Sequence, residues 1–257
     1  MRPLWTGTIG FGLVNIPVKL FSATQGSELD LDMLDKKDLS NIRFLRVNEK
    51  TGKEVVWGNI VKGYLLNNKY VVLDDKDFET ASAIKTKVIE ISDFVKQDEI
   101  NSIYYETPYY LVPEKSGVRA YALLKQALLK TGKVGIATFV MRNKEHLAIL
   151  KATDDVLILN QLRFSEEIRD IKDLDLHAAT VKPSELKMAV SLINQLSGKF
   201  NIAAYKDSYT KQLLKLIKAK AKGKKSEVAP MKVVHSKAKD LMEQLKASLS
   251  VKTKKAS

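Results

Sequence analysis

The stretch of sequence that decides the fold is residues 133–151, KVGIATFVMRNKEHLAILK. Small, β-branched and aromatic residues fill positions 134–141, and a run of this kind favours a buried or half-buried strand. Five polar residues follow, and the apolar pattern then returns up to residue 150. We therefore predict a β-hairpin whose strands contribute to a core and whose tip carries Arg142 and Lys144. These residues by themselves also fit a core hairpin with a merely solvated turn.

Strand patterns extend outward from this hairpin over residues 1–160. Apolar residues alternate in residues 5–23, where three glycines suit bulges or a bend in a barrel. A helix at residues 118–131 precedes the hairpin, and its predicted buried stripe is Ala122, Leu123, Ala127 and Leu128. Further strands are predicted at residues 86–91, 102–112 and 156–159, with a short helix near residues 76–82. The region is thus a mainly antiparallel β-barrel or sandwich with embedded helices.

Residues 41–72 form a basic segment within this region, with six basic and two acidic residues. One hairpin is predicted from residues 42–47 and 54–57, and a second from residues 60–66 and 70–73. Both hairpins are poor in core residues. We expect a protruding β arm that carries Arg43, Arg46, Lys53 and Lys62 on short strands.

Only helices are predicted after residue 183. A helix at residues 184–196 has Leu186, Val190, Ile193 and Leu196 at helical spacing. Asp207 is suited to cap a second helix that contains Leu213, Leu214, Leu216 and Ile217. A charged, flexible stretch at residues 222–230 leads to a last amphipathic helix near residues 236–249. We expect residues 251–257 to be a disordered basic tail.

Positive charge is concentrated at the end of the chain and in bands. The 257 residues contain 43 Lys and Arg against 30 Asp and Glu, a net charge of +13. Residues 211–257 carry +11 of it, and residues 1–210 carry only +2. Within the latter, residues 115–151 carry +7, whereas residues 73–106 and 152–185 carry −5 and −4. This pattern favours a polyanionic partner for one face and for the tail, although charged blocks are more often solvated surface.

Composition excludes several classes of protein. The chain has no cysteine, which rules out a disulfide framework or a thiolate zinc site and fits a reducing cytosol. Its 45% hydrophobic content is enough for a core in one or two domains. Residues 1–12 lack a signal-peptide pattern, and no apolar run approaches the roughly 20 residues of a membrane span. We expect a cytoplasmic protein with no membrane partner.

The chain carries no motif for catalysis or for metal binding. His146, His177 and His235 are far apart and lack metal-ligand spacing, and the P-loop, the dinucleotide fingerprint and GxSxG are absent. Carboxylates at residues 154–155 and 170–175 suit a turn and an acidic surface better than a metal site. We expect no enzymatic activity, no cofactor and no metal.

Five long segments resemble the bacterial Ku family, the DNA-end-binding proteins of non-homologous end joining. They are WTGTIGFGLVNIPVKLFSAT (residues 5–24), IRFLRVNEKTGKEVVWGNIVKGY (42–64), YVVLDDKDF (70–78), GKVGIATFVMRNKEHLAIL (132–150) and YKDSYTKQLLKLIKAKAKGK (205–224). The resemblance covers about residues 1–222. Residues 223–257 match least, because the family's basic extensions vary in length and sequence.

The resemblance implies an α+β fold, a mainly antiparallel β-barrel core with a β bridge or arm, followed by a helical C-terminal arm. Residues 1–180 would form the core, including the bridge at about residues 41–72. Residues 181–222 would form the helical arm. Residues 223–257 would form a lysine-rich extension with one amphipathic helix and a disordered tail.

The resemblance also implies a function. The family binds ends of linear double-stranded DNA, independently of sequence, as a ring-shaped homodimer in double-strand-break repair. It recruits and stimulates an ATP-dependent DNA ligase, ligase D, and would act at breaks in the bacterial nucleoid. One chain of this size is too small to enclose a duplex, so a two-fold homodimer is expected, with residues 184–196 and the bridge strands as its contacts.

Two sets of site residues follow. A ring that accepts any DNA end should hold phosphates rather than read bases. The predicted DNA-binding residues are Arg43, Arg46, Lys53, Lys62, Lys133, Arg142, Lys144, Lys220, Lys222, Lys224 and Lys225. The predicted ligase-binding residues are Tyr205, Tyr209, Leu213 and Leu214. The main alternative is a general basic nucleic-acid binder that uses its tail alone, and a second is a metal-dependent nuclease that uses the acidic bands.

Overall fold

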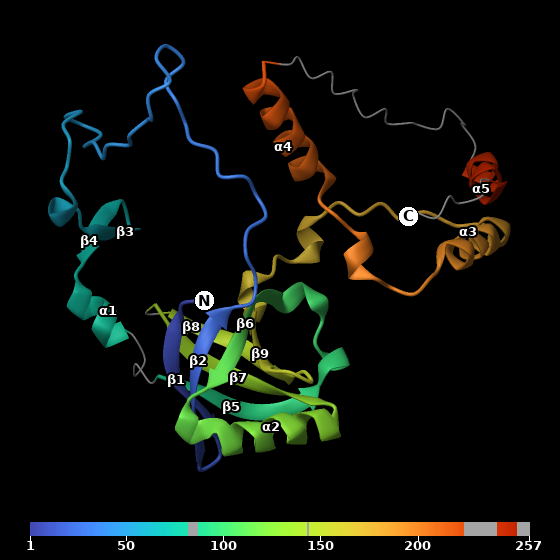
Figure 1. Cartoon of the computed structure of the whole chain (residues 1–257), viewed down its shortest axis with the longest axis horizontal. Coiled ribbons are helices and arrows are strands. Elements are labelled where there is room, and N and C mark those ends of the chain that lie inside the picture. The colour runs from blue at the N-terminus through green and yellow to red at the C-terminus, as the bar shows by residue number, and fades with distance from the viewer. Residues whose placement is uncertain (82–86, 143, 224–240, 251–257) are drawn as a thin grey trace. The chain divides into compact units, whose positions relative to one another are not determined.

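Two units make up the chain in the computed structural model, which describes residues 1–81, 87–142, 144–223 and 241–250 (Figure 1). The first unit comprises Met1–Gly26 and Asp32–Asp173. The second comprises Ser27–Leu31 and Leu174–Ser257.

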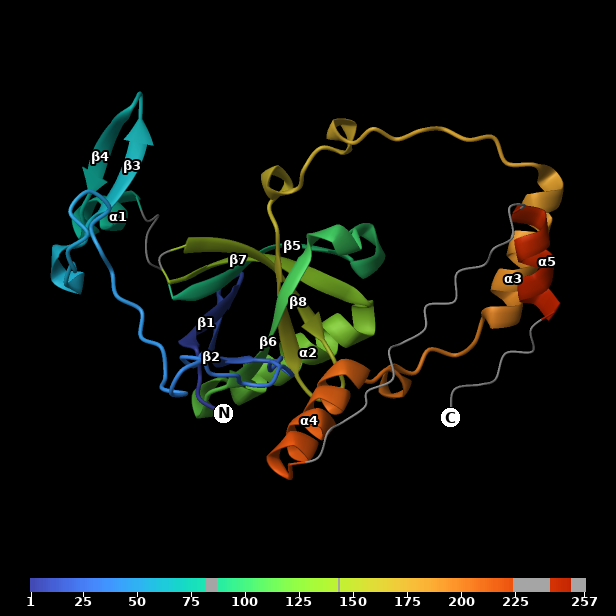
Figure 2. The same cartoon turned by 90° about the horizontal axis from the view of Figure 1, so that it is seen from above.

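A closed β-barrel of seven strands dominates the first unit in the described part of the chain. The strands are β1 (Trp5–Phe11), β2 (Val14–Ser22), β5 (Val88–Lys96), β6 (Tyr105–Pro113), β7 (Lys133–Met141), β8 (Lys144–Ala152) and β9 (Leu157–Leu162). Their order is β1-β2-β6-β9-β8-β7-β5, and the parallel pair β1–β5 closes a barrel whose other pairs are antiparallel (Figure 2). The predicted α+β fold with a mainly antiparallel barrel is confirmed.

The β7–β8 hairpin forms as predicted, but its turn is shorter. Met141 pairs with Lys144, and Phe139 pairs with His146, so Lys144 and His146 belong to the strand and not to the turn. Arg142 has a φ of 55°, the left-handed conformation that two-residue hairpin turns require because it matches the twist of the strands. Residue 143 lies outside the described part of the chain. Phe139, Ala148 and Leu150 are buried in the core, as predicted for the apolar part of the hairpin.

Helix α2 (Val118–Thr131) packs against the barrel and ends at Gly132, whose φ is 63°. Its buried side chains are Tyr121, Leu124 and Leu128. The predicted stripe is right at Leu128 but wrong at Leu123 and Ala127, which are exposed. Tyr121 fills a core position because its hydroxyl donates to the Leu111 carbonyl at 2.7 Å and accepts from the Leu157 amide at 2.7 Å. The predicted stripe contained only aliphatic residues and therefore missed the buried face, to which Tyr121 belongs.

The segment between β2 and β5 contains a second, two-stranded sheet, β3 (Lys62–Leu66) and β4 (Lys69–Leu73), followed by α1 (Asp75–Ala81). The second predicted hairpin is thus confirmed, with Asn67 and Asn68 at φ 47° and 61° in its turn. The first is reduced to a single bridge between Val47 and Glu54. We call residues 41–73 the arm.

The second unit contains the helices α3 (Pro183–Leu196), α4 (Ser208–Ala221) and α5 (Leu241–Ser250), and α3 contacts α5. The first two confirm the predicted helices, and Asp207 caps α4 as expected, accepting from the Thr210 amide at 3.1 Å. Predicted residues 236–240 lie outside the described part of the chain. Short 3-10 turns occur at Trp57–Asn59, Gln97–Glu99, Ser102–Tyr104, Lys115–Gly117, Ser165–Glu167, Ile171–Asp173 and Ile202–Ala204. None of the described helices is long and apolar enough to cross a membrane.

Candidate nucleic-acid interface

The arm presents basic residues on a backbone that its own side chains hold in place. In the turn over residues 48–53, the Asn48 side chain accepts from the amides of Lys50 at 3.0 Å and Thr51 at 3.1 Å. Gly52 has a φ of 65°, and its amide donates to the Asn48 carbonyl at 2.8 Å. This asparagine-centred turn places Lys53 at its exit, next to the Val47–Glu54 bridge.

Two of the predicted basic residues lie over aromatic rings. The Arg46 guanidinium is 4.5 Å from the centre of the Trp57 ring, and the Lys62 ammonium is 4.7 Å from the centre of the Phe78 ring. Cation–π contacts orient a charge without neutralising it. Among the described residues, none of Arg43, Arg46, Lys53 and Lys62 forms an ion pair, so all four charges remain available to phosphates.

The structure does not bring the basic residues of the β7–β8 hairpin together. Lys133 begins β7, whereas Arg142 and Lys144 lie at its other end. With a rise of about 3.3 Å per residue, a strand of this length separates its ends by about 26 Å. A single phosphate-binding patch therefore cannot include Lys133 and the hairpin tip.

The two basic residues at the tip also differ from each other. The Lys144 ammonium lies 3.4 Å from the Glu167 carboxylate, and Arg142 forms no ion pair within the described residues. Glu167 also accepts from the Phe164 amide at 2.9 Å. This amide first, and then Lys144, holds the pKa of Glu167 below its usual value. Glu167 therefore competes with phosphate for Lys144, and Arg142 is the freer charge.

Helix α4 and its C-cap residue carry a lysine stripe of which our site prediction included only Lys222. Lys211, Lys215, Lys218 and Lys222 recur at i, i+4, i+7 and i+11, the spacing of a single helical face. The predicted Lys220 instead shares the opposite face with Leu213 and Leu216. The spacing was present in the sequence and identifies the stripe. The other two predicted residues of this region, Lys224 and Lys225, lie outside the described part of the chain.

Only two of the four predicted ligase-binding residues, Tyr209 and Leu213, share a face of α4. Tyr205 precedes α4 and stacks on Phe200, with the ring centres 6.0 Å apart. Tyr209 and Leu213 lie one helical turn apart, and Leu214 is displaced by about 100° from Leu213 around the helix. Tyr205 and Tyr209 are both largely exposed, so neither is needed to hold the unit together.

The described residues contain no group of three or more His, Asp or Glu side chains that could hold a metal ion. The carboxylates that the sequence groups at residues 170–175 instead form local contacts. Asp170 pairs with Lys172 at 3.6 Å, and Asp175 lies 3.6 Å from His177.

Comparison with known proteins identifies this architecture. The family model for the Ku70/Ku80 beta-barrel domain matches residues 10–188. The chain is 43% identical to a non-homologous end joining protein Ku of Opitutus terrae over 90% of this chain and 84% of that protein. The chain belongs to the Ku family.

Ku-family relatives also match the chain outside the barrel. A non-homologous end joining protein Ku of Coxiella burnetii is 38% identical over 98% of this chain and 96% of its own length. One from the archaeon Archaeoglobus fulgidus is 40% identical over 97% of this chain and 98% of its own length. The names of these relatives state no enzymatic activity. A solved structure, the SPOC domain of human PHD-finger protein 3, is similar over 63% of this chain and 95% of its own chain, at 11% identity and a TM-score of 0.30.

Proposed function

We propose that this Ku-family chain binds the ends of linear double-stranded DNA, independently of sequence, as a ring-shaped homodimer in non-homologous end joining. It is a non-catalytic protein that acts at breaks in cytoplasmic, nucleoid DNA. Its second unit recruits and stimulates an ATP-dependent DNA ligase of the ligase D type. The names of the relatives support the role in end joining, and the arm supports the ring.

One observation carries the proposal: the arm folds without burying any of its side chains. Phe44, Trp57 and Tyr70 are 76%, 71% and 74% exposed. Large exposed apolar surfaces of this kind mark interaction sites. In the described residues, β3 and β4 form a sheet of two strands, so each also offers an unpaired edge. A second copy would cover the same surface reciprocally, as two-fold dimers do.

The charge of the arm supplies the second half of the proposal. Apolar contacts between two arms would close a bridge, and the unpaired Arg43, Arg46, Lys53 and Lys62 would line it. Lys62 lies on β3, whereas Arg43, Arg46 and Lys53 lie in the irregular segment before it and not on the predicted strands. Exposed side chains on such backbone can contact phosphates without the geometry needed to read base edges. Sequence-independent binding follows from such contacts.

The decisive experiment compares the protein's affinity for a linear duplex and for the same DNA closed into a circle. A ring loads only from an end, so we expect tight binding to the linear form and weak binding to the circle. Cutting the circle with a restriction enzyme should restore full binding, which controls for sequence and length. Equal affinity for both forms would contradict the ring.

A second function is favoured by one observation, the lysine stripe of α4 within the +11 segment of residues 211–257. A general nucleic-acid binder could act through this segment alone. It predicts that residues 211–257 bind DNA as well as the whole chain and show no preference for ends. The ring predicts that this segment alone loses the preference for linear DNA.

A further inference from the structure

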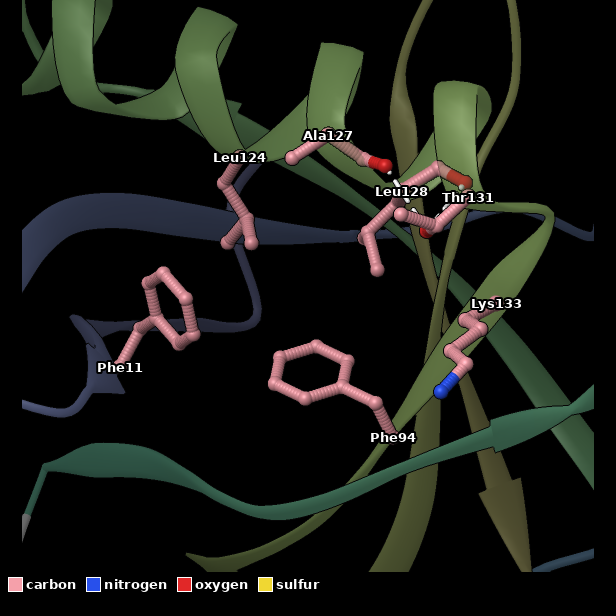
Figure 3. A pocket seen from close by; sticks show the side chains of 7 residues that line it. All are labelled: Phe11, Phe94, Leu124, Ala127, Leu128, Thr131 and Lys133. Atoms are coloured by element: carbon pink, nitrogen blue, oxygen red, sulfur yellow. Dashed lines mark hydrogen bonds between the residues drawn. The ribbon is translucent and has the colours of Figure 1, made fainter.

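An apolar cavity of about 260 Å³ lies between α2 and the strands β1, β5 and β7 of the barrel. Figure 3 shows Phe11 and Phe94 on the barrel side, facing Leu124 and Leu128 of α2, with the Lys133 side chain at one end. Ala127 lines the cavity and is exposed, so the space opens to the surface along the helix. We call this the α2 pocket.

The aromatic rings of the α2 pocket are fixed by the fold. Phe11 and Phe94 meet edge to face, with their centres 5.5 Å apart at an interplanar angle of 87°. Phe94 lies opposite Gly135 in the β5–β7 register. A Cβ on that glycine would come within 3.3 Å of the Phe94 ring, so the missing side chain leaves room for it. The pocket is therefore preformed, which lowers the entropy cost of binding.

Unpaired positive charge borders the pocket. Lys96 and Lys133 are direct partners in the β5–β7 register, and both are exposed. Like charges directly opposite each other destabilise a sheet. Neither ammonium forms an ion pair or hydrogen bond within the described part of the chain. A bound anion would remove the repulsion between them.

We propose that the α2 pocket docks an acidic segment of a partner protein, which inserts one bulky apolar side chain and places a carboxylate against Lys96 and Lys133. The volume lies just below the ~300–1,000 Å³ of pockets that hold whole small molecules, and suits a single leucine- or phenylalanine-sized group. The α2 residues of the site and Lys133 lie in the +7 band of residues 115–151, whereas Phe94 and Lys96 come from the −5 band of residues 73–106. The inference does not depend on DNA binding, and it gives Lys133 a role other than contacting DNA.

The lining favours a protein segment over an unpaired DNA base. The Thr131 hydroxyl already donates to the Ala127 carbonyl at 2.8 Å and lies 3.3 Å from the Leu128 carbonyl. The other lining groups are apolar, apart from the Lys133 ammonium. The polar edge of a buried base would therefore lose its hydrogen bonds to water without replacement, whereas an aliphatic or phenyl side chain loses none.

The test is a selection of short random peptides displayed on phage, with the full-length wild-type protein as target. Selected peptides are measured by fluorescence anisotropy against three variants. Ala127→Leu fills the pocket from an exposed helical position. Gln126→Leu places a leucine at an exposed position about 100° further around α2, outside the lining of the pocket, and controls for added apolar surface. Lys96→Ala with Lys133→Ala removes the charges. Thermal unfolding of each variant checks that it remains folded.

We expect selected peptides to combine a bulky apolar residue with Asp or Glu. Ala127→Leu should weaken them by about tenfold or more, the value of burying one side chain, and Gln126→Leu should leave them unchanged. The double lysine variant should also weaken binding and reduce its salt dependence. Equal binding to Ala127→Leu and Gln126→Leu, or the recovery of no binding peptide, would overturn the proposal. So would a loss of affinity for linear DNA in Ala127→Leu alone, which would assign the pocket to DNA.

Discussion

The barrel and the arm of this chain use apolar residues in opposite ways. Ile9, Leu111 and Leu150 of the barrel are fully buried, whereas Phe44, Trp57 and Tyr70 of the arm are largely exposed. The barrel obtains its stability from its own core, because burial of apolar surface is the main favourable term in folding. The arm has no core of its own, so burial within one chain does not account for its large apolar residues. The barrel is therefore the scaffold, and the arm is the surface that we propose contacts a second copy.

Charging the apolar surface of the arm should have the largest effect on this comparison. In the variant Phe44→Asp with Tyr70→Asp, two exposed rings are replaced by carboxylates that a dimer interface cannot bury. We expect a monomer by analytical ultracentrifugation and a loss of about 10²-fold or more in affinity for linear DNA, because two linked binding surfaces become one. Leu123→Asp, at an exposed apolar position of the barrel helix, should remain dimeric. A dimeric arm variant would show that the contact lies elsewhere.

Truncating one apolar residue in the barrel should lower the free energy of unfolding, and truncating one in the arm should leave it nearly unchanged. Leu150→Ala removes a fully buried side chain and should lower the free energy of unfolding by about 2–5 kcal/mol. Phe44→Ala removes an exposed one and should change it by about 0.5 kcal/mol or less within one chain. Urea unfolding followed by circular dichroism measures both, at several protein concentrations because dimerisation adds to apparent stability. A similar loss in both variants that does not depend on protein concentration would mean that the arm packs against a core.

The fold of the barrel was predictable because its signals are local. Alternating apolar residues in β7 and β8, and the glycine that ends α2, specify these elements without knowledge of the rest of the chain. The turn at Arg142 was predicted too long, since polar residues 144–146 continue the strand. Residues 144–146 are polar, yet they pair with β7, and this pairing determines where the strand begins.

The candidate site was less predictable, because the charge of a residue does not show which residues distant in sequence lie next to it in the fold. Arg142 and Lys144 look alike in the sequence, and a carboxylate 23 residues beyond Lys144 distinguishes them. Lys133 and the hairpin tip are close in sequence but lie at opposite ends of a strand. The α4 stripe, by contrast, depends only on helical spacing, and the sequence alone is enough to find it.

Salt dependence should show how much of the DNA affinity belongs to the arm. If about eight phosphates are neutralised per ring, log affinity should fall with log salt at a slope of about −7. Replacing Arg43 and Lys53 by Gln in both chains should reduce the magnitude of this slope by about 3 to 4. The control is Lys172→Gln, whose lysine is paired with Asp170 in the barrel unit. An unchanged slope would remove the arm from the DNA contact.

Substitutions at the hairpin tip should change DNA affinity least, and their effects should differ from one residue to the next. Arg142→Gln should weaken DNA binding more than Lys144→Gln, because Glu167 already neutralises part of the Lys144 charge. Glu167→Gln should strengthen binding by a few-fold, since it leaves Lys144 free for phosphate. Fluorescence anisotropy on one linear duplex at low salt measures all three. The opposite order for the two basic residues would mean that the ion pair opens on DNA.

The Glu167 carboxylate should also make the free energy of unfolding depend on pH, and this effect can be measured without DNA. The pKa of Glu167 is lowered in the folded state, first by the Phe164 amide and then by Lys144. A depressed carboxylate pKa stabilises the fold above the unfolded-state value, and this contribution is lost as the pH falls through the folded-state value. As the pH falls across that acidic range, the free energy of unfolding should therefore decrease more for the wild type than for Glu167→Gln, which lacks the titrating group. Because Glu167 is exposed, the difference should be small, and NMR titration of its side chain should show the shift directly.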